Sequence, residues 1–485
     1  MTKTKISGRL IEKGILEKAL CSAVPEFIAI YGRRRVGKTF LVREFFGDAI
    51  CFEIVGVHNA SLKVQLKNFS YALKDASGID ILPQIPGSWY EAFSILQQFI
   101  ESLRRNQKRG KHIIFFDEIP WLNTPKSNFL GALEHFWNSF GSKHIDLILI
   151  ICGSAASWMI QKIVNSKGGL HNRLTRQIRL LPFSLAETED FLVSRGIHLS
   201  RFQIISLFMA IGGVPFYLMQ AEPGFSTAQI IDKLCFSKEG LLRNEFDKLF
   251  TSLFDKSEHH IRIVEILKSK RSGMNRNQIL SLAKIPSGGT ASKILEELEE
   301  SGFITSSVQF GKKSNDAIYR ISDEFTIFYF DWIKPLGKRD PGQGFWLSRQ
   351  NEPRKKVWAG YVFEGICQKH VPQIKNSLGI GGIETFYGPW YHFDQEKRPG
   401  KSAQIDLLID RKDATMNLCE MKFSESEFTI DSDYAKKIKQ KLKVLRSVTK
   451  TRKNVFITLI TTYDVERNKH FFDIVSNSLT LDCLF

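Results

Sequence analysis

The chain has 485 residues, of which 43% are hydrophobic and 25% are charged. These values are typical of a soluble globular protein and leave room for about three domains. The net charge of +17 and the pI of about 9.4 favour a polyanionic partner, most simply nucleic acid. The alternative interpretation is a basic protein whose charge only keeps it in solution.

The cysteines and the apolar runs exclude several other classes. The seven cysteines are scattered and form no C-x-x-C pair, so neither a zinc ribbon nor a disulfide framework is indicated. They suit a reducing cytoplasm. The first six residues lack the apolar run of a signal peptide, and the longest apolar run, Leu147 to Cys152, is too short to span a bilayer. We therefore expect a cytoplasmic protein with no membrane partner.

Strand-like and helix-like stretches alternate from an entry helix over residues 6–24 to about residue 182. The predicted strands cover residues 27–31, 50–55, 112–117, 145–152 and 177–181, and the predicted helices cover residues 40–46, 60–74, 90–104 and 127–140. Such alternation predicts an α/β fold in which helices cover both faces of a parallel sheet.

The stretch Gly32-Arg-Arg-Arg-Val-Gly-Lys-Thr39 follows the first predicted strand and fits the phosphate-binding pattern G-x-x-x-x-G-K-[ST]. Its glycines allow the backbone to wrap a polyphosphate. Lys38 is expected to reach the β- and γ-phosphates of a nucleotide, and Thr39 to ligate Mg²⁺. The loop arginines either add charge near the phosphates or lie on the surface.

Two later strand ends are expected to complete the nucleotide site. Asp117 and Glu118 follow a buried strand, which suits Asp117 as a second Mg²⁺ contact and Glu118 as the general base. Ser154, after the next strand, either senses the γ-phosphate or caps a helix. Arg173 either reaches a γ-phosphate, in its own subunit or a neighbour's, or forms a surface salt bridge. The predicted nucleotide-binding set is Gly32, Arg33, Arg34, Arg35, Val36, Gly37, Lys38, Thr39, Phe40, Ser154 and Arg173.

Residues 185–256 are helical in pattern and interrupted by Gly212-Gly-Val-Pro215. Residues 257–324 predict helices over 260–269, 277–283 and 290–301, followed by a hairpin, which is the order of a winged helix-turn-helix. Four glutamates on the third helix oppose DNA phosphates, so only its first turn and the hairpin tip at Lys312 and Lys313 suit DNA. The alternative role is a structural lever between domains. Residues 325–355 are aromatic and resemble a connector.

Residues 356–485 predict a separate α/β unit with a sharper set of residues. Asp406 lies on one predicted strand, and Glu420 and Lys422 share a face of the next. Two carboxylates and a lysine can hold Mg²⁺ and activate water against a phosphodiester, and Glu364 on the preceding helix completes the predicted metal set of Glu364, Asp406 and Glu420. The basic helix over 434–446 suits either a phosphate backbone or solvent.

Several of these stretches resemble one family: the phosphate loop, Phe116-Asp-Glu-Ile-Pro-Trp-Leu122, Gly153-Ser154, Gly212-Gly-Val-Pro215 and Tyr319-Arg-Ile-Ser-Asp-Glu-Phe325. The chain is similar to prokaryotic AAA-superfamily ATPases, close to the STAND class, that carry a C-terminal nuclease-like domain. The resemblance covers nearly the whole chain and implies ATP binding. The C-terminal residues resemble a PD-(D/E)xK nuclease core, but Gln404 stands where an upstream acid is expected, which puts cleavage in doubt.

The expected organisation is a P-loop ATPase core over residues 1–184, a helical lid over 185–256, a winged helix over 257–324, a connector over 325–355 and a nuclease-like domain over 356–485. The expected function is an ATPase coupled to a Mg²⁺-dependent nuclease-like, DNA-binding domain. The alternative is a regulator that uses ATP as a signal and only recognises nucleic acid or protein through its C-terminal unit. Whether the chain forms a homo-oligomer stays open.

Overall fold

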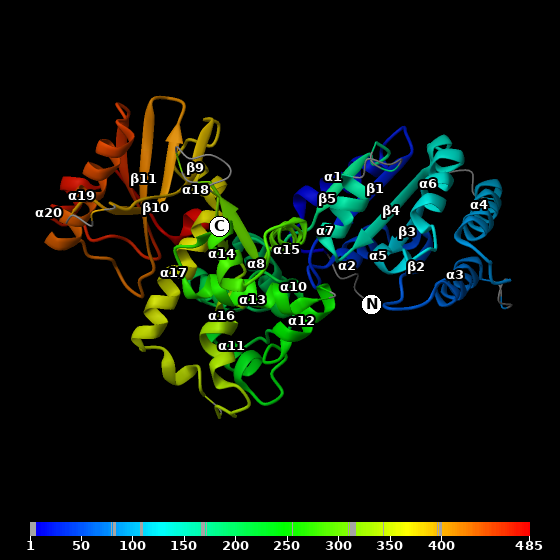
Figure 1. Ribbon diagram of the computed structural model, residues 1–485, viewed down its shortest axis with the longest axis horizontal. Helices are drawn as coiled ribbons and strands as arrows, with labels where there is room; N and C mark the ends of the chain where they lie inside the picture. Colours follow the sequence, from blue (N-terminus) through cyan, green and yellow to red (C-terminus); the bar gives the residue numbers. More distant parts are fainter. Residues whose placement is uncertain are drawn as a thin grey trace. The chain divides into compact units, whose positions relative to one another are not determined.

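A computed structural model describes residues 6–485 except 79, 81–83, 107–109, 166–169, 171, 255, 309, 311–316, 343, 395 and 397–399. The chain divides into two compact units, residues 1–182 and 183–485 (Figure 1). Among the described residues, no helix combines the length and the apolarity needed to cross a membrane. The predicted hairpin tip, Lys312 and Lys313, lies outside the described residues.

The first unit is built on a five-stranded parallel sheet in the order β2-β3-β4-β1-β5. Its strands are β1 (Glu26–Tyr31), β2 (Ile50–Val55), β3 (His112–Asp117), β4 (Leu147–Gly153) and β5 (Arg176–Arg179). β1, β3 and β4 are buried along their whole length, which explains why they read as continuous apolar runs. The predicted parallel α/β sheet is confirmed.

Helices cover both faces of this sheet. One face packs against helices α3 to α7 and the other against α1 and α2, because successive strand residues point to opposite sides. The helices are α1 (Leu10–Leu20), α2 (Lys38–Phe46), α3 (Leu62–Ser77), α4 (Trp89–Asn106), α5 (Ile119–Leu122), α6 (Phe129–Ser139) and α7 (Ala156–Met159), with the short segments η1 (Gly47–Ala49), η2 (Gly141–Lys143) and η3 (Ile160–Val164).

The second unit begins with helices whose apolar core continues through α17 to Leu484 near the end of the chain. They are α8 (Leu185–Ser194), α9 (Arg201–Ile211), α10 (Pro215–Leu218), α11 (Thr227–Ile231), η4 (Asp232–Phe236) and α12 (Glu245–Leu253). Next come α13 (Ser257–Ser269), α14 (Arg276–Ala283), α15 (Gly289–Glu300) and an antiparallel sheet of order β6-β8-β7, made of β6 (Met274–Asn275), β7 (Ile304–Ser307) and β8 (Ile318–Ile321). The three predicted helices and the predicted hairpin strands lie close to these positions, and the winged-helix assignment stays a prediction.

The segment expected to be a connector is partly a buried helix. Residues 324–333 form α16 (Glu324–Phe328) and η6 (Tyr329–Ile333), and every one of these side chains is buried. Trp332, Trp346 and Trp358 pack edge to face with centroids 5.0 to 6.3 Å apart. Aromatic residues that look like a loop in the sequence therefore belong to the core. Short segments η7 (Lys334–Leu336) and η8 (Leu347–Arg349) follow.

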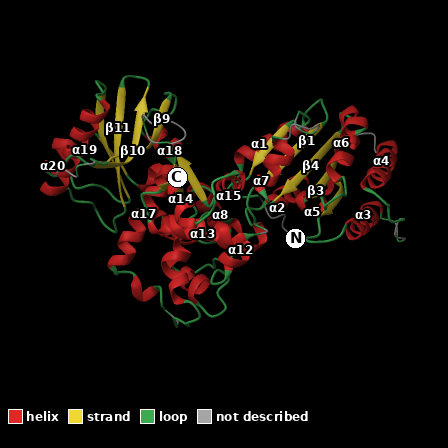
Figure 2. Ribbon diagram, in the orientation of Figure 1, coloured by secondary structure: helices red, strands yellow, loops and turns green. Residues whose placement is uncertain are grey.

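The C-terminal part carries a second five-stranded sheet in the order β13-β12-β11-β10-β9. Figure 2 labels β9, β10 and β11 of this sheet. Its strands are β9 (Thr385–His392), β10 (Ala403–Arg411), β11 (Thr415–Lys422), β12 (Asn454–Thr461) and β13 (Asn477–Leu479). α17 (Pro353–Lys369) packs on one face and α19 (Ser432–Thr449) on the other. The remaining elements are α18 (Val371–Ser377), α20 (Lys469–Ile474) and η9 (Leu481–Leu484).

Candidate functional site

The carboxyl edge of the first sheet gathers the predicted nucleotide residues. β1 ends at Tyr31 and leads into the phosphate loop, and its parallel neighbour β4 ends level with it at Gly153. β3 ends at Asp117 on the same edge, because it runs parallel to β4. The edge therefore presents the loop, Asp117, Glu118 and Ser154 together, as ligand sites of open α/β sheets do.

Gly32 is required by a close approach between backbones. A Cβ atom at this position would lie 2.2 Å from the carbonyl oxygen of Leu180, whose amide donates to Tyr31 O across 2.7 Å. Gly37 has a φ of 92° and caps α2, in space that is open around its Cα. The first glycine thus fits the loop against β5, and the second allows the turn into the helix.

Lys38 is the first residue of α2, and its side chain is buried at the centre of the loop. Its ammonium group donates to Gly32 O across 2.8 Å, to Arg33 O across 3.0 Å and to Ser154 Oγ across 3.0 Å. Burial lowers its pKa, against the opposing charges of Glu118 and Asp117. A buried ammonium group needs anionic neighbours, and this position suits the phosphates that the motif predicts.

Thr39 and Asp117 meet beside Lys38. The Thr39 hydroxyl donates to Asp117 Oδ2 across 2.6 Å, and the Glu118 amide donates to Asp117 Oδ1 across 2.9 Å. Burial raises the pKa of Asp117. A hydroxyl and a carboxylate side by side are the hard oxygen donors that Mg²⁺ prefers, so the residues present fit the predicted metal.

Glu118 and Ser154 form the next link. The Ser154 amide donates to Glu118 Oε2 across 3.0 Å, and the Ser154 hydroxyl donates to Glu118 Oε1. Ser154 does not cap the helix that follows, because the N-cap of α7 is Ala155. The serine instead joins Lys38 to Glu118, which holds the predicted base at a defined place beside the loop.

The other loop residues have unequal surroundings. Arg33 and Val36 are buried, whereas Phe40 is 46% exposed on α2. The guanidinium of Arg34 lies 5.1 Å from the ring centroid of Trp121, which follows the Asp117–Glu118 pair. Arg35 has a φ of 71°. Arg34 therefore stacks on the segment after β3, which joins the loop to the acidic strand end.

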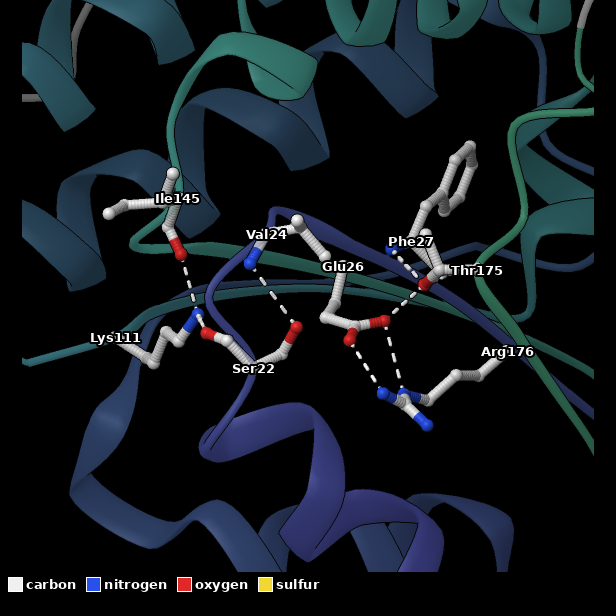
Figure 3. Close-up of polar contacts among 8 residues, drawn as sticks. All are labelled: Ser22, Val24, Glu26, Phe27, Lys111, Ile145, Thr175 and Arg176. Carbon is white, nitrogen blue, oxygen red and sulfur yellow. Dashed lines mark hydrogen bonds and ion pairs between the residues drawn. The ribbon is translucent and has the colours of Figure 1, made fainter.

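Arg173 lies at the opposite edge of the sheet. It precedes β5, and the register of β5 against β1 places Arg176 beside Ile28. Figure 3 shows this amino edge, where Arg176 pairs with the buried Glu26 across 2.7 Å. The length of β1, about 16 Å from Phe27 to the loop, separates Arg173 from the phosphates. The strand register therefore places Arg173 near the amino ends of the strands, away from the phosphate loop of its own chain.

Arg9 is a residue of this region that sequence reasoning missed. Its side chain is buried, donates to Val36 O across 3.1 Å and approaches Glu12 at 3.5 Å. The residue before the entry helix thereby fixes the phosphate loop from outside. The backbone of Arg9 is left-handed, with a φ of 55°, and this conformation cannot be read from the sequence.

In the second unit, strands β10 and β11 bring the predicted acids and lysine together. Asp406 Oδ2 accepts from the Met421 amide across 3.1 Å, and the Lys422 ammonium lies 4.0 Å from both Asp406 and Glu420. Asp406 and Glu420 are buried, whereas the side chain of Lys422 is 31% exposed. We call Asp406, Glu420 and Lys422 the acid–lysine centre.

Glu364 and Gln404 flank this centre. Burial and the nearby charge of Asp406 raise the pKa of Glu364, on α17, to about 8. Gln404 is exposed and pairs with Tyr391 of β9. Among the described residues, no group of three or more histidine, cysteine, aspartate or glutamate side chains is arranged to hold a metal ion. The charges of Asp406 and Glu420 both act on Glu364, so the three predicted carboxylates lie near one another, and their metal role stays a prediction.

Lys441 explains part of this arrangement. It projects from α19 toward β11 and donates to both carboxylate oxygens of Glu420 across 2.7 Å. Sequence reasoning included Lys441 in a basic helix face without distinguishing it. Its spacing from Ile438 and Leu445, both fully buried, was the available signal, because residues three and four apart share a helix face.

The first turn of α15, predicted as the part that suits DNA, is exposed at Thr290, Ser292 and Lys293. Glutamates of α15 are engaged inside the unit. Glu297 accepts from His260 across 2.8 Å, and Glu299 accepts from the Ser306 amide across 2.8 Å. The acidic end of α15 thus has internal partners.

Residues 9–221 match the model of the family ATPase_2, described as an ATPase domain predominantly from Archaea. The segment contains the complete set of Lys38, Thr39, Asp117, Glu118 and Ser154. An uncharacterized protein of Methanocaldococcus jannaschii, MJECL04, is 24% identical over 411 residues, which is 82% of this chain and 83% of that protein. An alignment of that length extends into the second unit. The family match supports an ATP-binding ATPase.

Solved structures with partial likeness include the Walker-type ATPase of Pyrococcus abyssi, at 18% identity and a TM-score of 0.47 over 66% of this chain and 95% of that one. The ORC2 protein of Aeropyrum pernix, in complexes with ADPNP and ADP, is 15% identical with a TM-score of 0.41 over 67% and 94%. A STAND protein of Pyrococcus horikoshii is 15% identical with a TM-score of 0.29 over 78% and 52%.

Proposed function

We propose that this protein hydrolyses ATP at the carboxyl edge of its first sheet and couples the nucleotide to a nuclease-like, DNA-binding C-terminal centre. One observation carries the ATPase part. Lys38, Ser154 and Glu118 form one hydrogen-bonded chain beside the Thr39–Asp117 pair. A phosphate-binding lysine, an oxygen-donor pair and a candidate base thereby lie within one site, in the segment that matches an ATPase family.

Each residue of the nucleotide site has a role that follows from its chemistry. Lys38 and the loop amides bind the β- and γ-phosphates, and Thr39 with Asp117 holds Mg²⁺. When bound, the metal supplies charge neutralisation on the phosphate oxygens. Glu118 orients the attacking water and accepts its proton, and Ser154 holds the Glu118 carboxylate and the Lys38 ammonium in register.

The test uses two variants with different expected losses. Lys38→Ala removes a charged donor, so we expect nucleotide affinity to fall by about 10- to 100-fold. Glu118→Gln keeps binding but loses the base, so phosphate release should fall by about 100-fold or more. A fluorescent ATP analogue and a phosphate-release assay measure the two effects. The exposed Lys63→Ala and Glu44→Gln serve as matched controls, and unaltered hydrolysis in both test variants would refute the assignment.

The nuclease-like part rests on the acid–lysine centre and on its setting. An α17 helix, the antiparallel strands β9 to β11, the α19 helix and the parallel strand β12 follow in the order expected for the nuclease core. Asp406, Glu420 and Lys422 converge at its middle. We expect cleavage of single- or double-stranded DNA with Mg²⁺ or Mn²⁺ to depend on Asp406 and Lys422. Cleavage that survives Asp406→Ala and Lys422→Ala would place the activity elsewhere.

A second candidate function is favoured by the Lys441–Glu420 pair. Lys441 occupies both oxygens of a carboxylate that a metal would need. The protein would then be an ATP-switched regulator whose C-terminal unit recognises nucleic acid or protein without cutting it. Isothermal titration with Mn²⁺ distinguishes the two. Binding with cleavage supports the nuclease, and absence of both, together with slow ATP hydrolysis, supports the regulator.

Oligomer formation is part of the proposal because of Arg173. This arginine is too far from its own phosphate loop, so it serves hydrolysis only in a neighbouring subunit. We expect ATP to promote a homo-oligomer and Arg173→Ala to reduce hydrolysis without weakening nucleotide binding. Light scattering with and without an ATP analogue measures the assembly. A monomer that hydrolyses ATP at an undiminished rate after Arg173→Ala would leave the arginine with a surface role.

A further inference from the structure

Arg320 lies on β8, the central strand of the small antiparallel sheet, and has no role in the sites described above. Its Nε donates to Ser272 O across 3.2 Å. The side chain also packs over Gly273, because a Cβ atom on that glycine would lie 2.8 Å from Arg320 Cγ. The backbone just before β6 therefore holds this arginine in one direction.

The segment that holds Arg320 packs against α17. Arg271 directly precedes Ser272, and its guanidinium lies 5.1 Å from the centroid of the Tyr361 ring. Tyr361 stands on α17 three residues before Glu364, so the two side chains share a face of that helix. Arg320 is therefore held beside the part of α17 that borders the acid–lysine centre.

The charge of Arg320 acts on groups from two elements around this centre. Burial raises the pKa of Tyr361 on α17 and of Tyr391 on β9, and the charge of Arg320 opposes both shifts. The same charge acts on Glu364, on which the opposite charge of Asp406 also acts. Arg320, Tyr361 and Tyr391 are all partly exposed, so they form the rim of the centre.

Arg320 differs from the two lysines of the centre in the donors that it has to spare. Lys441 donates to both oxygens of Glu420, and Lys422 lies 4.0 Å from each of two carboxylates, so both ammonium groups are engaged. Among the described residues, only the Nε of Arg320 has an acceptor, and no ion pair joins its guanidinium to Glu364. The terminal nitrogens of a guanidinium form a rigid fork that matches the oxygens of a phosphate.

We propose that Arg320 is a phosphate-binding residue of the acid–lysine centre, and that its terminal nitrogens hold the non-bridging oxygens of a nucleic-acid phosphodiester at the rim. The proposal rests on the proposed function, because it takes nucleic acid to be the ligand of this centre. The buried Asp406 and Glu420 keep their lysine neighbours, so no buried ion pair has to break. The centre is then shared, with the phosphate contact from residues 257–324 and the acids and lysines from residues 356–485.

Arg320→Gln tests the contact because it removes the charge and keeps a polar side chain. Binding of a fluorescein-labelled DNA duplex to the full chain is measured by anisotropy in EDTA, so that cleavage cannot intervene. We expect affinity to fall by about fivefold or more, and the slope of log affinity against log salt concentration to fall by about one. Arg320→Lys should restore the slope but only part of the affinity, because it restores the charge without the fork. Arg262→Gln, exposed on α13, is the matched control.

A double-mutant cycle separates the phosphate contact from a purely structural role beside Glu364. If Arg320 only offsets the charge of Glu364, then Arg320→Gln should have no effect on affinity in a chain that already carries Glu364→Gln. A phosphate contact does not depend on that carboxylate. We therefore expect Arg320→Gln to lower affinity by a similar factor in wild type and in Glu364→Gln. An effect that vanishes in Glu364→Gln would overturn the phosphate contact.

The outcomes also separate this contact from the nuclease. Weaker binding and a lower salt slope in Arg320→Gln, without any Mn²⁺-dependent cleavage by wild type, keep the phosphate contact and remove the nuclease. Cleavage by wild type together with unchanged binding by Arg320→Gln overturns the phosphate contact alone. A wild-type protein that binds no duplex overturns both. Binding that weakens equally in Arg262→Gln assigns the loss to net charge and overturns the phosphate contact.

Discussion

Lys441 and Glu420 meet across the interface between α19 and β11, where one ammonium group donates to both oxygens of a fully buried carboxylate at 2.7 Å. A buried carboxylate without a partner is strongly destabilising, so this pair maintains the fold around the acid–lysine centre. It also sets a competition, because a cation that needs Glu420 must displace the lysine.

That competition leads to a prediction about metal binding. Lys441→Met leaves the buried Glu420 with only the more distant Lys422, at 4.0 Å, as a described ammonium neighbour, so we expect a lower melting temperature in EDTA. Mn²⁺ should then raise the melting temperature of Lys441→Met more than that of wild type, since the cation replaces the lost ammonium charge. Differential scanning fluorimetry measures both shifts. Lys443→Met should behave like wild type, and equal Mn²⁺ shifts in all three proteins would contradict the competition.

Ser154 should affect the rate of ATP hydrolysis more than the binding of ATP. Its hydroxyl accepts from Lys38 and donates to Glu118, so Ser154→Ala loosens the candidate base but keeps the amide contact to Glu118. We expect kcat to fall by about five- to tenfold with a KM within about twofold of wild type. Steady-state phosphate release gives both constants. Ser157→Ala, also buried but on α7, is the control, and an equal loss there would show a packing effect.

Alanine substitutions at two glycines should change the free energy of unfolding in opposite directions. Gly32→Ala drives a Cβ to 2.2 Å from Leu180 O, a backbone atom that has little freedom to move, and should lower the free energy of unfolding by about 3 kcal/mol or more. Gly14 lies within α1 with open space around it. Gly14→Ala should raise the free energy of unfolding by up to about 1 kcal/mol. Urea unfolding compares them, and a neutral Gly32→Ala would contradict the close approach.

His370 predicts a pH dependence of stability. Its Nδ1 donates to Ile366 O across 2.8 Å, its Nε2 accepts from the Leu185 amide across 3.3 Å, and burial lowers its pKa to about 4. The unfolded histidine binds a proton near pH 6.5, so stability is lost as the pH falls from about 6.5 toward 4. This residue should account for about 2 kcal/mol between pH 7 and pH 5.

Urea unfolding of His370→Gln at pH 7 and pH 5 measures that contribution. Glutamine does not titrate, so the variant should lose about 2 kcal/mol less than wild type on acidification, whatever its stability at pH 7. The exposed His198→Gln should keep the wild-type difference. An unchanged difference in His370→Gln would show that other groups cause the loss.

The first unit could be predicted well because its signals are local. Fully buried strands such as β3 and β4 appear as unbroken apolar runs, and the loop motif fixes the edge at which they end. Strand β9 was missed because Gly388 and Pro389 interrupt its pattern. The buried aromatic residues of α16 were mistaken for a connector because burial by distant helices leaves no local period.

The candidate site residues show the same difference between local signals, which a sequence contains, and tertiary contacts, which it does not. Asp117 and Glu118 could be predicted because chain order places them after a strand. The sequence left open whether Arg173 reaches the nucleotide of its own subunit or of a neighbour, and the register of β5, which places it near the amino ends of the strands, depends on tertiary pairing. Lys441 points inward, whereas the lysines near it on α19 are exposed. Which lysine points inward depends on the face of α19 that packs against β11, and tertiary contacts decide that face.

The apolar core of the second unit runs without a break from Phe183 through Trp358 to Leu484. In an expression fragment that starts at residue 356, α17 would therefore lose the residues that pack against it. The apolar surface exposed in this way would promote aggregation. Fragments meant for crystallisation or cleavage assays should begin at residue 183, and limited proteolysis should release that whole piece rather than its C-terminal third.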